Sequence, residues 1–300
     1  MATPTTTKRL ALGLAATLLG AAPARAQDLL PELTRLTRDS LARGYVPATF
    51  KGTRIINGHS IETPGQGSLV FLISHRFGRL NSGAYEFFGL DQATIRLGLE
   101  YGLTDRLAVG GGRSSLEKNF DGFLKYKALR QSTGAGALPV SVTLLATAAL
   151  TSLRLAPEPA RSTASRLTYT YQALLARKIS EGLSVQLMPT LLHRNYVALR
   201  RDQNNVCALG VAGRQKLSKR LALTAEYYYL APGPTADDYR NALALGFDIE
   251  TGGHVFQLHF TNAQGMIEKF FIPQTQGNFW RGDLYFGFNV ARSFQLRSQR

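Results

Sequence analysis

The chain has 300 residues, of which 44% are hydrophobic, and a formal net charge of +15. This length allows one large domain or two of ordinary size. The single cysteine, Cys207, excludes an internal disulfide and a multi-cysteine metal site.

Residues 1–26 are predicted to be a secretory signal peptide. Lys8 and Arg9 precede an apolar run over residues 10–22, and Ala24-Arg25-Ala26 provides the small residues of a cleavage site. The run is shorter than the roughly 20 residues that span a bilayer, and a buried N-terminal helix is the alternative. For an exported basic protein, anionic lipid head groups are the favoured partner, and no nucleic acid is expected.

Residues 27–66 form a separate N-terminal segment. The stretch LLPELTRLTRDSLARGY predicts a short helix, and KGTRIINGHSIETPGQG predicts a short strand with turns. The segment could lie in the periplasm, cross a barrel lumen as a plug, or add a strand to the barrel. The sequence leaves these three placements open.

Apolar and polar residues alternate with period 2 through residues 67–300. Ile95, Leu97 and Leu99, for example, have the opposite parity to their polar or small neighbours. We predict twelve strands: 67–77, 92–102, 105–114, 121–130, 139–152, 165–178, 182–194, 204–216, 219–230, 239–250, 253–263 and 282–296. Most exceed the five or six residues typical of soluble sheets and match the roughly 9–11 residues of a membrane-crossing strand.

Short and long connections alternate between these strands. Tight turns at 104–105, 180–182, 217–219 and 251–253 alternate with longer loops. There are two exceptions: the link SSLEKNF between the third and fourth strands is of modest length, and the link QSTGAGAL between the fourth and fifth strands is longer than a tight turn. We therefore predict an all-β, transmembrane, up-and-down antiparallel β-barrel of about 12 strands over residues 67–300, with short periplasmic turns and long extracellular loops. The predicted location is the cell outer membrane; a soluble exported β-sandwich or lipocalin-like protein is the alternative.

The last predicted strand, residues 282–296, is hydrophobic on one face almost to its end. Its apolar parity ends at Phe294 and Leu296, which resemble the C-terminal signal that barrel-assembly machinery reads. As the strand that closes the barrel, it would face lipid and leave no free edge. The expected surroundings are therefore outer-membrane lipid, lipopolysaccharide and that assembly machinery.

The parity that faces the lumen carries charge. The candidate lumen-lining residues are Arg76, Arg96, Glu100, Lys125, Lys127, Arg166, Arg214, Glu226, Asp248 and His259. Such charges either line an aqueous path or interlock as a salt-bridged filling. The favoured function is a pore for a small solute, with an anion preferred because bases outnumber acids. The alternative is a non-conducting barrel that docks a periplasmic partner.

An outer-membrane hydrolase is the least favoured function. The histidines His254 and His259 lie on opposite strand faces, and the chain contains no HExxH, GxSxG or CxxCH motif. We predict no catalytic residue, no metal and no cofactor.

Four motifs resemble an uncharacterised family of outer-membrane β-barrels from Bacteroidota, a Gram-negative group. They are TRIINGHSIE, SHRFG, GGGRSS and KNFDGFLKYK, and their polar members are His59, His75, Arg76, Arg113, Lys118 and Asp121. The resemblance implies a barrel in the outer membrane and brings no established substrate or catalytic residue. Family members are often encoded near exported lipid-binding and cytochrome-like proteins, which implies a periplasmic partner.

Overall fold

The computed structural model describes residues 44–153, 162–197 and 201–296. The predicted signal peptide and the helix expected before Gly44 lie outside these residues. The chain divides into a small unit, Met1–Gly44 with Thr133–Ala137, and a large unit, Tyr45–Ser132 with Leu138–Arg300. Of the small unit only Gly44 and 133–137 are described. Apart from the short strands that include Gly44 and Thr133, all that follows concerns the large unit.

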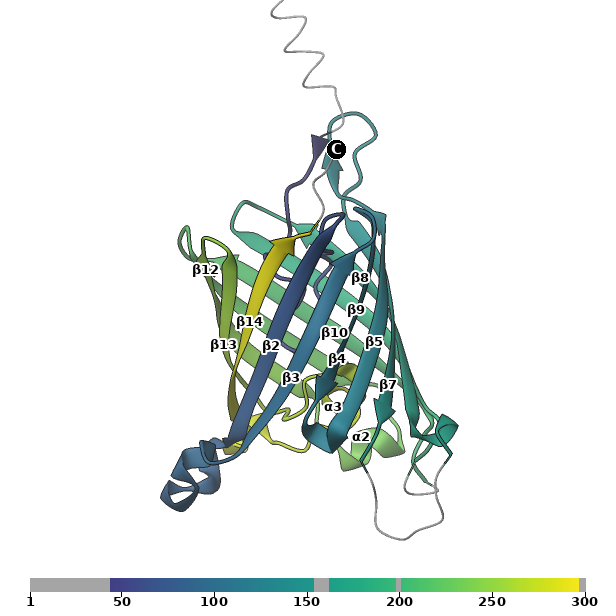
Figure 1. Cartoon of the computed structure of the whole chain (residues 1–300), viewed down its shortest axis with the longest axis vertical. Helices are drawn as coiled ribbons and strands as arrows, with labels where there is room; N and C mark the ends of the chain where they lie inside the picture. The colour runs from purple at the N-terminus through teal and green to yellow at the C-terminus, as the bar shows by residue number, and fades with distance from the viewer. Residues whose placement is uncertain (1–43, 154–161, 198–200, 297–300) are drawn as a thin grey trace, which may run out of the picture. The chain divides into compact units, whose positions relative to one another are not determined.

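Twelve antiparallel strands of the large unit form a closed barrel (Figure 1). Each strand pairs with the next one along the chain, and β14 closes the ring against β2. The strands are β2 (Ser68–Arg79), β3 (Ala93–Gly102), β4 (Leu107–Ser114), β5 (Asn119–Leu129), β7 (Ser141–Thr151), β8 (Leu167–Lys178), β9 (Leu183–Arg194), β10 (Asn205–Lys216), β11 (Leu221–Leu230), β12 (Ala242–Thr251), β13 (His254–Thr261) and β14 (Tyr285–Gln295). The short strands β1 (Gly44–Tyr45) and β6 (Ser132–Thr133) form a separate two-stranded sheet. The predicted fold class and strand number are confirmed.

The barrel is apolar outside and polar inside. In β9, Leu187 and Leu191 are exposed, whereas Gln186 and Thr190 on the opposite face are buried. The other strands repeat this pattern, as membrane barrels require. Within the described part of the chain, no helix is both long enough and apolar enough to cross a membrane.

The connections differ between the two ends of the barrel. Tight turns join β3 to β4, β8 to β9, β10 to β11 and β12 to β13; this is the turn end. The opposite loop end carries η1 (Leu80–Ser82), η2 (Ala84–Gly89), η3 (Leu116–Lys118), η4 (Ala164–Arg166), α2 (Pro234–Asp238), α3 (Glu268–Phe271) and η5 (Phe279–Arg281). The predicted alternation of connection lengths holds except at two links: residues 115–118 between β4 and β5 are as short as a tight turn, and residues 130–140 between β5 and β7 form a long link at the turn end. The assignment of the turn end to the periplasm stays a prediction.

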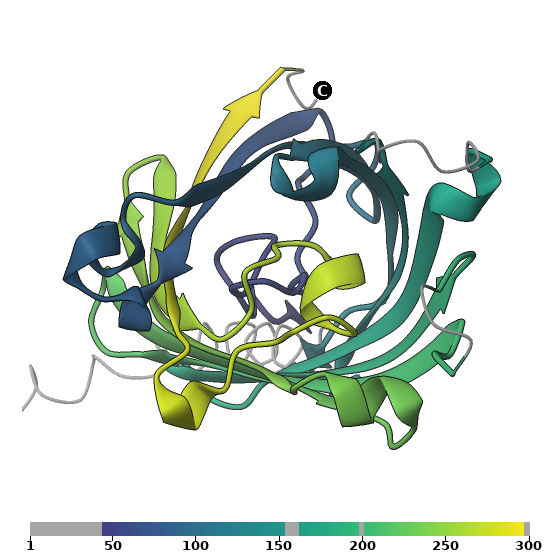
Figure 2. The same cartoon turned by 90° about the horizontal axis from the view of Figure 1, so that it is seen from below.

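Two segments fill the lumen. Residues 49–62, called the plug, precede β2, and residues 262–276, called the inner loop, connect β13 to β14. Figure 2 shows both inside the ring of strands, the plug in purple and the inner loop in yellow-green. Ile55 and Ile61 of the plug and Phe271 of the inner loop are about 1% exposed or less, and they share one apolar cluster with wall residues such as Met188. The structure thus shows the lumenal placement for residues 49–62. Residues 27–43 of the predicted N-terminal segment lie outside the described residues.

Candidate functional site: the lumenal plug and its wall

The plug ends in a small hairpin, residues 53–60, called the tip. Arg54 and His59 form an antiparallel bridge, the Ile55 amide donates to the Gly58 carbonyl (2.9 Å), and the Ser60 amide donates to the Thr53 carbonyl (3.0 Å). Asn57-Gly58 is a common hairpin-turn pair. The hairpin thus uses the amides of Ile55 and Ser60 and leaves those of residues 56–58 free to bond to the wall.

Glu226 of β11 binds these three free amides. Its Oε1 accepts from the Asn57 amide (2.8 Å), and its Oε2 accepts from the amides of Ile56 and Gly58 (both 3.2 Å). The side chain is 2% exposed. Consecutive backbone N–H groups that converge on one anion form a nest, and hydrogen bonds to an ionised acceptor are stronger than neutral ones. Glu226 is therefore the main polar anchor of the tip.

Neighbouring strands bind the remaining polar groups of the tip. Gln257 of β13 donates to the Ile55 carbonyl (2.7 Å), and Asn289 of β14 donates to the Ile56 carbonyl (2.9 Å). Nη2 of Arg76 on β2 donates to the Asn57 side-chain oxygen (2.5 Å). Four strands of the wall, β2, β11, β13 and β14, therefore hold the tip.

The opposite wall holds the return arm of the plug. Gln186 of β9 accepts from the Ile61 amide and donates to the His59 carbonyl (both 2.8 Å). Thr143 of β7 donates to the Ile61 carbonyl (3.0 Å). Lys125 of β5 donates to the carbonyls of Thr53 (3.1 Å) and Glu62 (2.9 Å). The plug is thus attached across the lumen by polar side chains.

An ion pair joins the plug to the inner loop. Arg54 Nη1 lies 3.2 Å from Glu268 Oε1, and both side chains are about 95% buried. The Nε2 atom of His59 lies 3.7 Å from the same carboxylate oxygen. Burial lowers the pKa of His59 well below 6.5, with a further contribution from Arg54, and burial raises the pKa of Glu268 above 4.5. His59 is therefore neutral at neutral pH.

The predicted lumen-lining residues are buried inside the barrel with two exceptions. Eight of them are buried at 8% exposure or less: Arg76, Arg96, Glu100, Lys125, Arg214, Glu226, Asp248 and His259. Lys127 is only partly buried and lies 3.3 Å from Glu62 of the plug. Arg166 lies in η4, outside the strands, because β8 begins at Leu167 and not at residue 165.

Several of these charges pair within the wall. Arg96 pairs with Asp121 (2.5 Å), and Arg214 pairs with Asp248 (3.1 Å) and Glu250 (2.6 Å). Asp121 and Glu250 were not in the predicted set, and they offset much of its basic excess. The lumen charges thus form an interlocked filling in this structure.

Charge-based sequence reasoning missed the neutral anchors of the plug. Gln186, Gln257, Asn289 and Thr143 make five of the wall contacts described above. Each has the parity of the predicted lumen charges, so a search for all hydrogen-bonding side chains on that parity would have found them.

The residues of the family motifs fall in different places. His59 lies in the plug, and Asp121 pairs with Arg96. His75 lies on the outward face, where its ring stacks on Phe288 at 4.9 Å. Arg113 lies over the Phe120 ring at 5.5 Å, and Lys118 belongs to η3. Of these residues, Arg76 and His59 are the ones that contact the plug–wall site.

The hydrogen bonds around His59 do not assemble a nucleophile. The Ser60 hydroxyl donates to the Gly52 carbonyl (2.5 Å), and His59 faces Glu268. A catalytic serine instead bonds to its histidine. Across residues 44–153, 162–197 and 201–296, no group of three or more His, Cys, Asp or Glu side chains could hold a metal ion.

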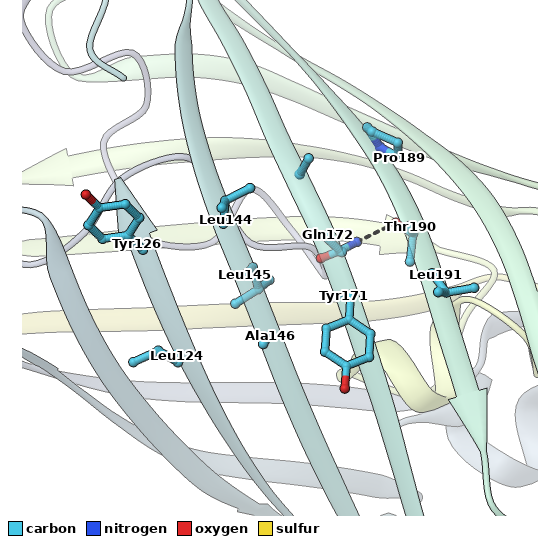
Figure 3. A pocket seen from close by; sticks show the side chains of 11 residues that line it. Leu124, Tyr126, Leu144, Leu145, Ala146, Tyr171, Gln172, Pro189, Thr190 and Leu191 are labelled. Atoms are coloured by element: carbon cyan, nitrogen blue, oxygen red, sulfur yellow. Dashed lines mark hydrogen bonds between the residues drawn. The ribbon is translucent and has the colours of Figure 1, made fainter. Parts of the chain in front are cut away.

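A hollow of about 680 Å³ lies on the outer surface over β5, β7, β8 and β9 (Figure 3). Tyr126, Leu144, Tyr171 and Leu191 border it, and each of them is 45–52% exposed. Its floor includes Ala146 and Ala173, whose small side chains leave the space open. Because the bordering side chains point outward, the hollow belongs to the lipid-facing surface and not to the lumen.

The comparison with protein families matches residues 50–294 to the model described as membrane bound beta barrel domain (DUF5777). The chain therefore belongs to this family of membrane β-barrels. A search of curated proteins finds no match.

Solved barrels of similar structure include the KdgM porin, with 10% identity and a TM-score of 0.47 over 76% of this chain and 99% of that one. The COG4313 outer membrane channel from Pseudomonas putida F1 has 14% identity and a TM-score of 0.43, over 78% of this chain and 98% of that one. OmpT of Vibrio cholerae has 9% identity and a TM-score of 0.34, over 77% of this chain and 99% of that one.

Proposed function

We propose that this membrane β-barrel is an outer-membrane channel for a small solute and that its own plug holds it closed. In this proposal the signal peptide exports the chain, the turn end faces the periplasm, and lipid with lipopolysaccharide surrounds the barrel. The observation that carries the proposal is the mode of attachment of the plug. It crosses the lumen as a separate segment, and the bonds described above tie it to the wall through side chains.

Such an attachment is reversible in water. Exchanging a protein–protein hydrogen bond for bonds to water changes the free energy by only about 0.5–1.5 kcal/mol. Backbone bonds within β2 to β14 are untouched when Gln186, Thr143 or Lys125 releases the plug, so the barrel stays closed as a sheet. In this proposal the plug leaves the lumen without unfolding the wall, and its apolar residues Ile55 and Ile61 separate from the wall cluster at the same time.

The wall charges give weaker support for an anionic solute than their sequence count suggested. Arg96 and Arg214 are neutralised by wall carboxylates. Arg76 and Lys125, in contrast, donate to the plug. These two cations would face the aqueous path once the plug is displaced, and they support an anion preference.

Planar-bilayer recordings of the purified full chain test the proposal. The double variant Gln186→Ala with Thr143→Ala removes three plug bonds, and at about 1 kcal/mol each it should raise the open probability at least roughly ten-fold over wild type. Gln172→Ala is the matched control, because Gln172 is a buried lumenal glutamine whose amide donates to Thr190 of the wall (2.8 Å). It should leave the open probability unchanged.

Deleting residues 49–62 gives the limiting case. The proposed channel is supported if this deletion variant shows stepwise conductance and if the open probability of the double variant lies between those of the deletion variant and wild type. Absence of conductance in a correctly inserted deletion variant would contradict it. That result would favour the second candidate, a closed barrel that docks a periplasmic partner. The complete burial of His59 and Arg76 supports the closed state of the lumen in that candidate.

A further inference from the structure

We propose that the tip is a carboxylate-binding site, occupied by Glu226 in the closed barrel and by a free carboxylate solute when the plug is displaced. The inference rests on the proposed channel and names the class of its opening ligand.

The donors of this site are spare donors of the hairpin. The tip makes its own bonds with the amides of Ile55 and Ser60, while those of residues 56–58 all point to one carboxylate. Oε1 takes one amide and Oε2 takes two, so both oxygens of a planar carboxylate are used. This arrangement belongs to the plug alone and moves with it.

A buried cation lies against the same turn. The Arg76 side chain is 0% exposed and bonds to Asn57 through Nη2, while its Nε has no hydrogen-bond partner among the described residues. The Asn57 side-chain nitrogen is also without a partner there. An arginine and unused N–H donors next to a backbone nest are the groups that recognise a carboxylate. They are an observation independent of Glu226. Arg76 belongs to β2 of the wall and adds to the site only while the tip lies beside it, whereas the three backbone amides and the Asn57 side chain move with the plug.

The tip can bind one carboxylate at a time. In the closed tip the amides of residues 56–58 all donate to Glu226, so none of the three is left for a second anion. A free carboxylate can therefore bind only after Glu226 has left, and it stabilises the displaced plug. Because Glu226 is tethered, it competes at a high local concentration, and opening requires a correspondingly high ligand concentration.

Acetate rescue tests the site without relying on conduction. Glu226→Ala removes Cγ, Cδ and both carboxylate oxygens, which are the heavy atoms of acetate. The variant should unfold at a lower temperature than wild type, and potassium acetate should raise its unfolding temperature with saturation. Potassium chloride at equal ionic strength, and the neutral isostere acetamide, should not.

Glu100→Ala is the matched control for the rescue. Glu100 is also a buried wall glutamate, but its carboxylate oxygens accept no hydrogen bond from the described residues. Potassium acetate should raise the unfolding temperature of this variant no more than potassium chloride does at equal ionic strength. Equal rescue of both variants, or of neither, would overturn the assignment of the tip as a carboxylate site.

Wild-type recordings test the role of the free ligand. Acetate should raise the open probability over chloride in a concentration-dependent manner, and this increase should be lost when residues 49–62 are deleted. If acetate raises the unfolding temperature of Glu226→Ala but no variant conducts, the carboxylate site is supported and the proposed channel is contradicted. If the double variant conducts but acetate neither stabilises Glu226→Ala nor raises the open probability of wild type, the channel is supported and the carboxylate site is contradicted.

Discussion

His59 connects the plug, the inner loop and the wall at a single side chain. It is fully buried, lies 3.7 Å from Glu268 and has Arg54, Lys125 and Arg96 among the charges that act on it. Burial is the largest cause of its lowered pKa. The folded barrel therefore holds a neutral imidazole, whereas the unfolded chain takes up a proton near its ordinary pKa of 6.5.

This difference predicts acid sensitivity. Below pH 6.5 the unfolded state binds more protons at His59, so its free-energy contribution to folding falls by up to about 1.4 kcal/mol per pH unit. Glu268 acts in the opposite direction, because its raised pKa makes the folded state the better proton acceptor as pH falls toward 4.5. His59→Gln should therefore flatten the loss of stability below pH 6.5, measured by denaturant unfolding across that range. An unchanged slope relative to wild type, or an equal flattening by His193→Gln on the outward face, would contradict the assignment.

The outward residues allow a second test at this scale. Val211 lies in the middle of β10 and is 44% exposed. If this face meets hydrocarbon, Val211→Arg should reduce the free energy of unfolding by about 2–4 kcal/mol. Leu217→Arg, at the tight turn after β10, should cost at most about 1 kcal/mol. Guanidinium unfolding in lipid vesicles measures both, and equal costs would indicate that Val211 does not meet the membrane.

At the scale of elements, the tip depends on one glycine. Gly58 lies so close to the Tyr228 hydroxyl that a methyl group at its Cα has no space. Gly58→Ala should displace the tip, lower the free energy of unfolding by about 1–3 kcal/mol and raise the open probability. Thermal unfolding and bilayer recording measure the two effects.

Gly65→Ala is the control for that substitution. A Cβ at Gly65 would meet Ser68 Oγ at 3.7 Å, which is an ordinary contact. Its stability and conductance should match those of wild type. If Gly58→Ala behaves like Gly65→Ala, the tip does not fit the wall as tightly as the structure indicates.

The strands could be predicted from sequence because their signal is local. Each of the twelve predicted ranges overlaps one observed strand, since the period-2 pattern is imposed by lipid on one face and the lumen on the other. The strand predicted over residues 165–178 began two residues too early because Arg166 has the same parity as the lumen-facing Thr168, although it belongs to η4.

The plug could not be placed in the same way. Its contacts join residues far apart in the chain, such as Asn57 to Glu226 and Ile56 to Asn289, and no local pattern records them. The stretch TRIINGHSIE indicated a strand with a turn, which is the observed hairpin, but its location depended on the wall. Neutral wall partners such as Gln186 carried no charge signal at all.

At the scale of the molecule, one strand, β14, both closes the ring of the barrel and binds the plug. β14 pairs with β13 on one side and with β2 on the other, and its Asn289 also binds the tip. The strand that ends the sheet therefore also helps to close the lumen. Losing it would expose the edges of β2 and β13 and release one anchor of the plug.

Deleting Asn289–Arg300 should therefore abolish membrane assembly. The truncation removes most of the register between β14 and β2, from Asn289↔Ser74 to Gln295↔Ser68, and unpaired backbone groups in hydrocarbon cost several kcal/mol each. Extraction of the membrane fraction with urea, together with heat-modifiable gel mobility, measures assembly. Asn289→Ala separates the two roles: it removes the bond to the tip but keeps the strand, so it should assemble like wild type and open more often. A truncated chain that inserts normally would show that β14 is not needed to close the barrel.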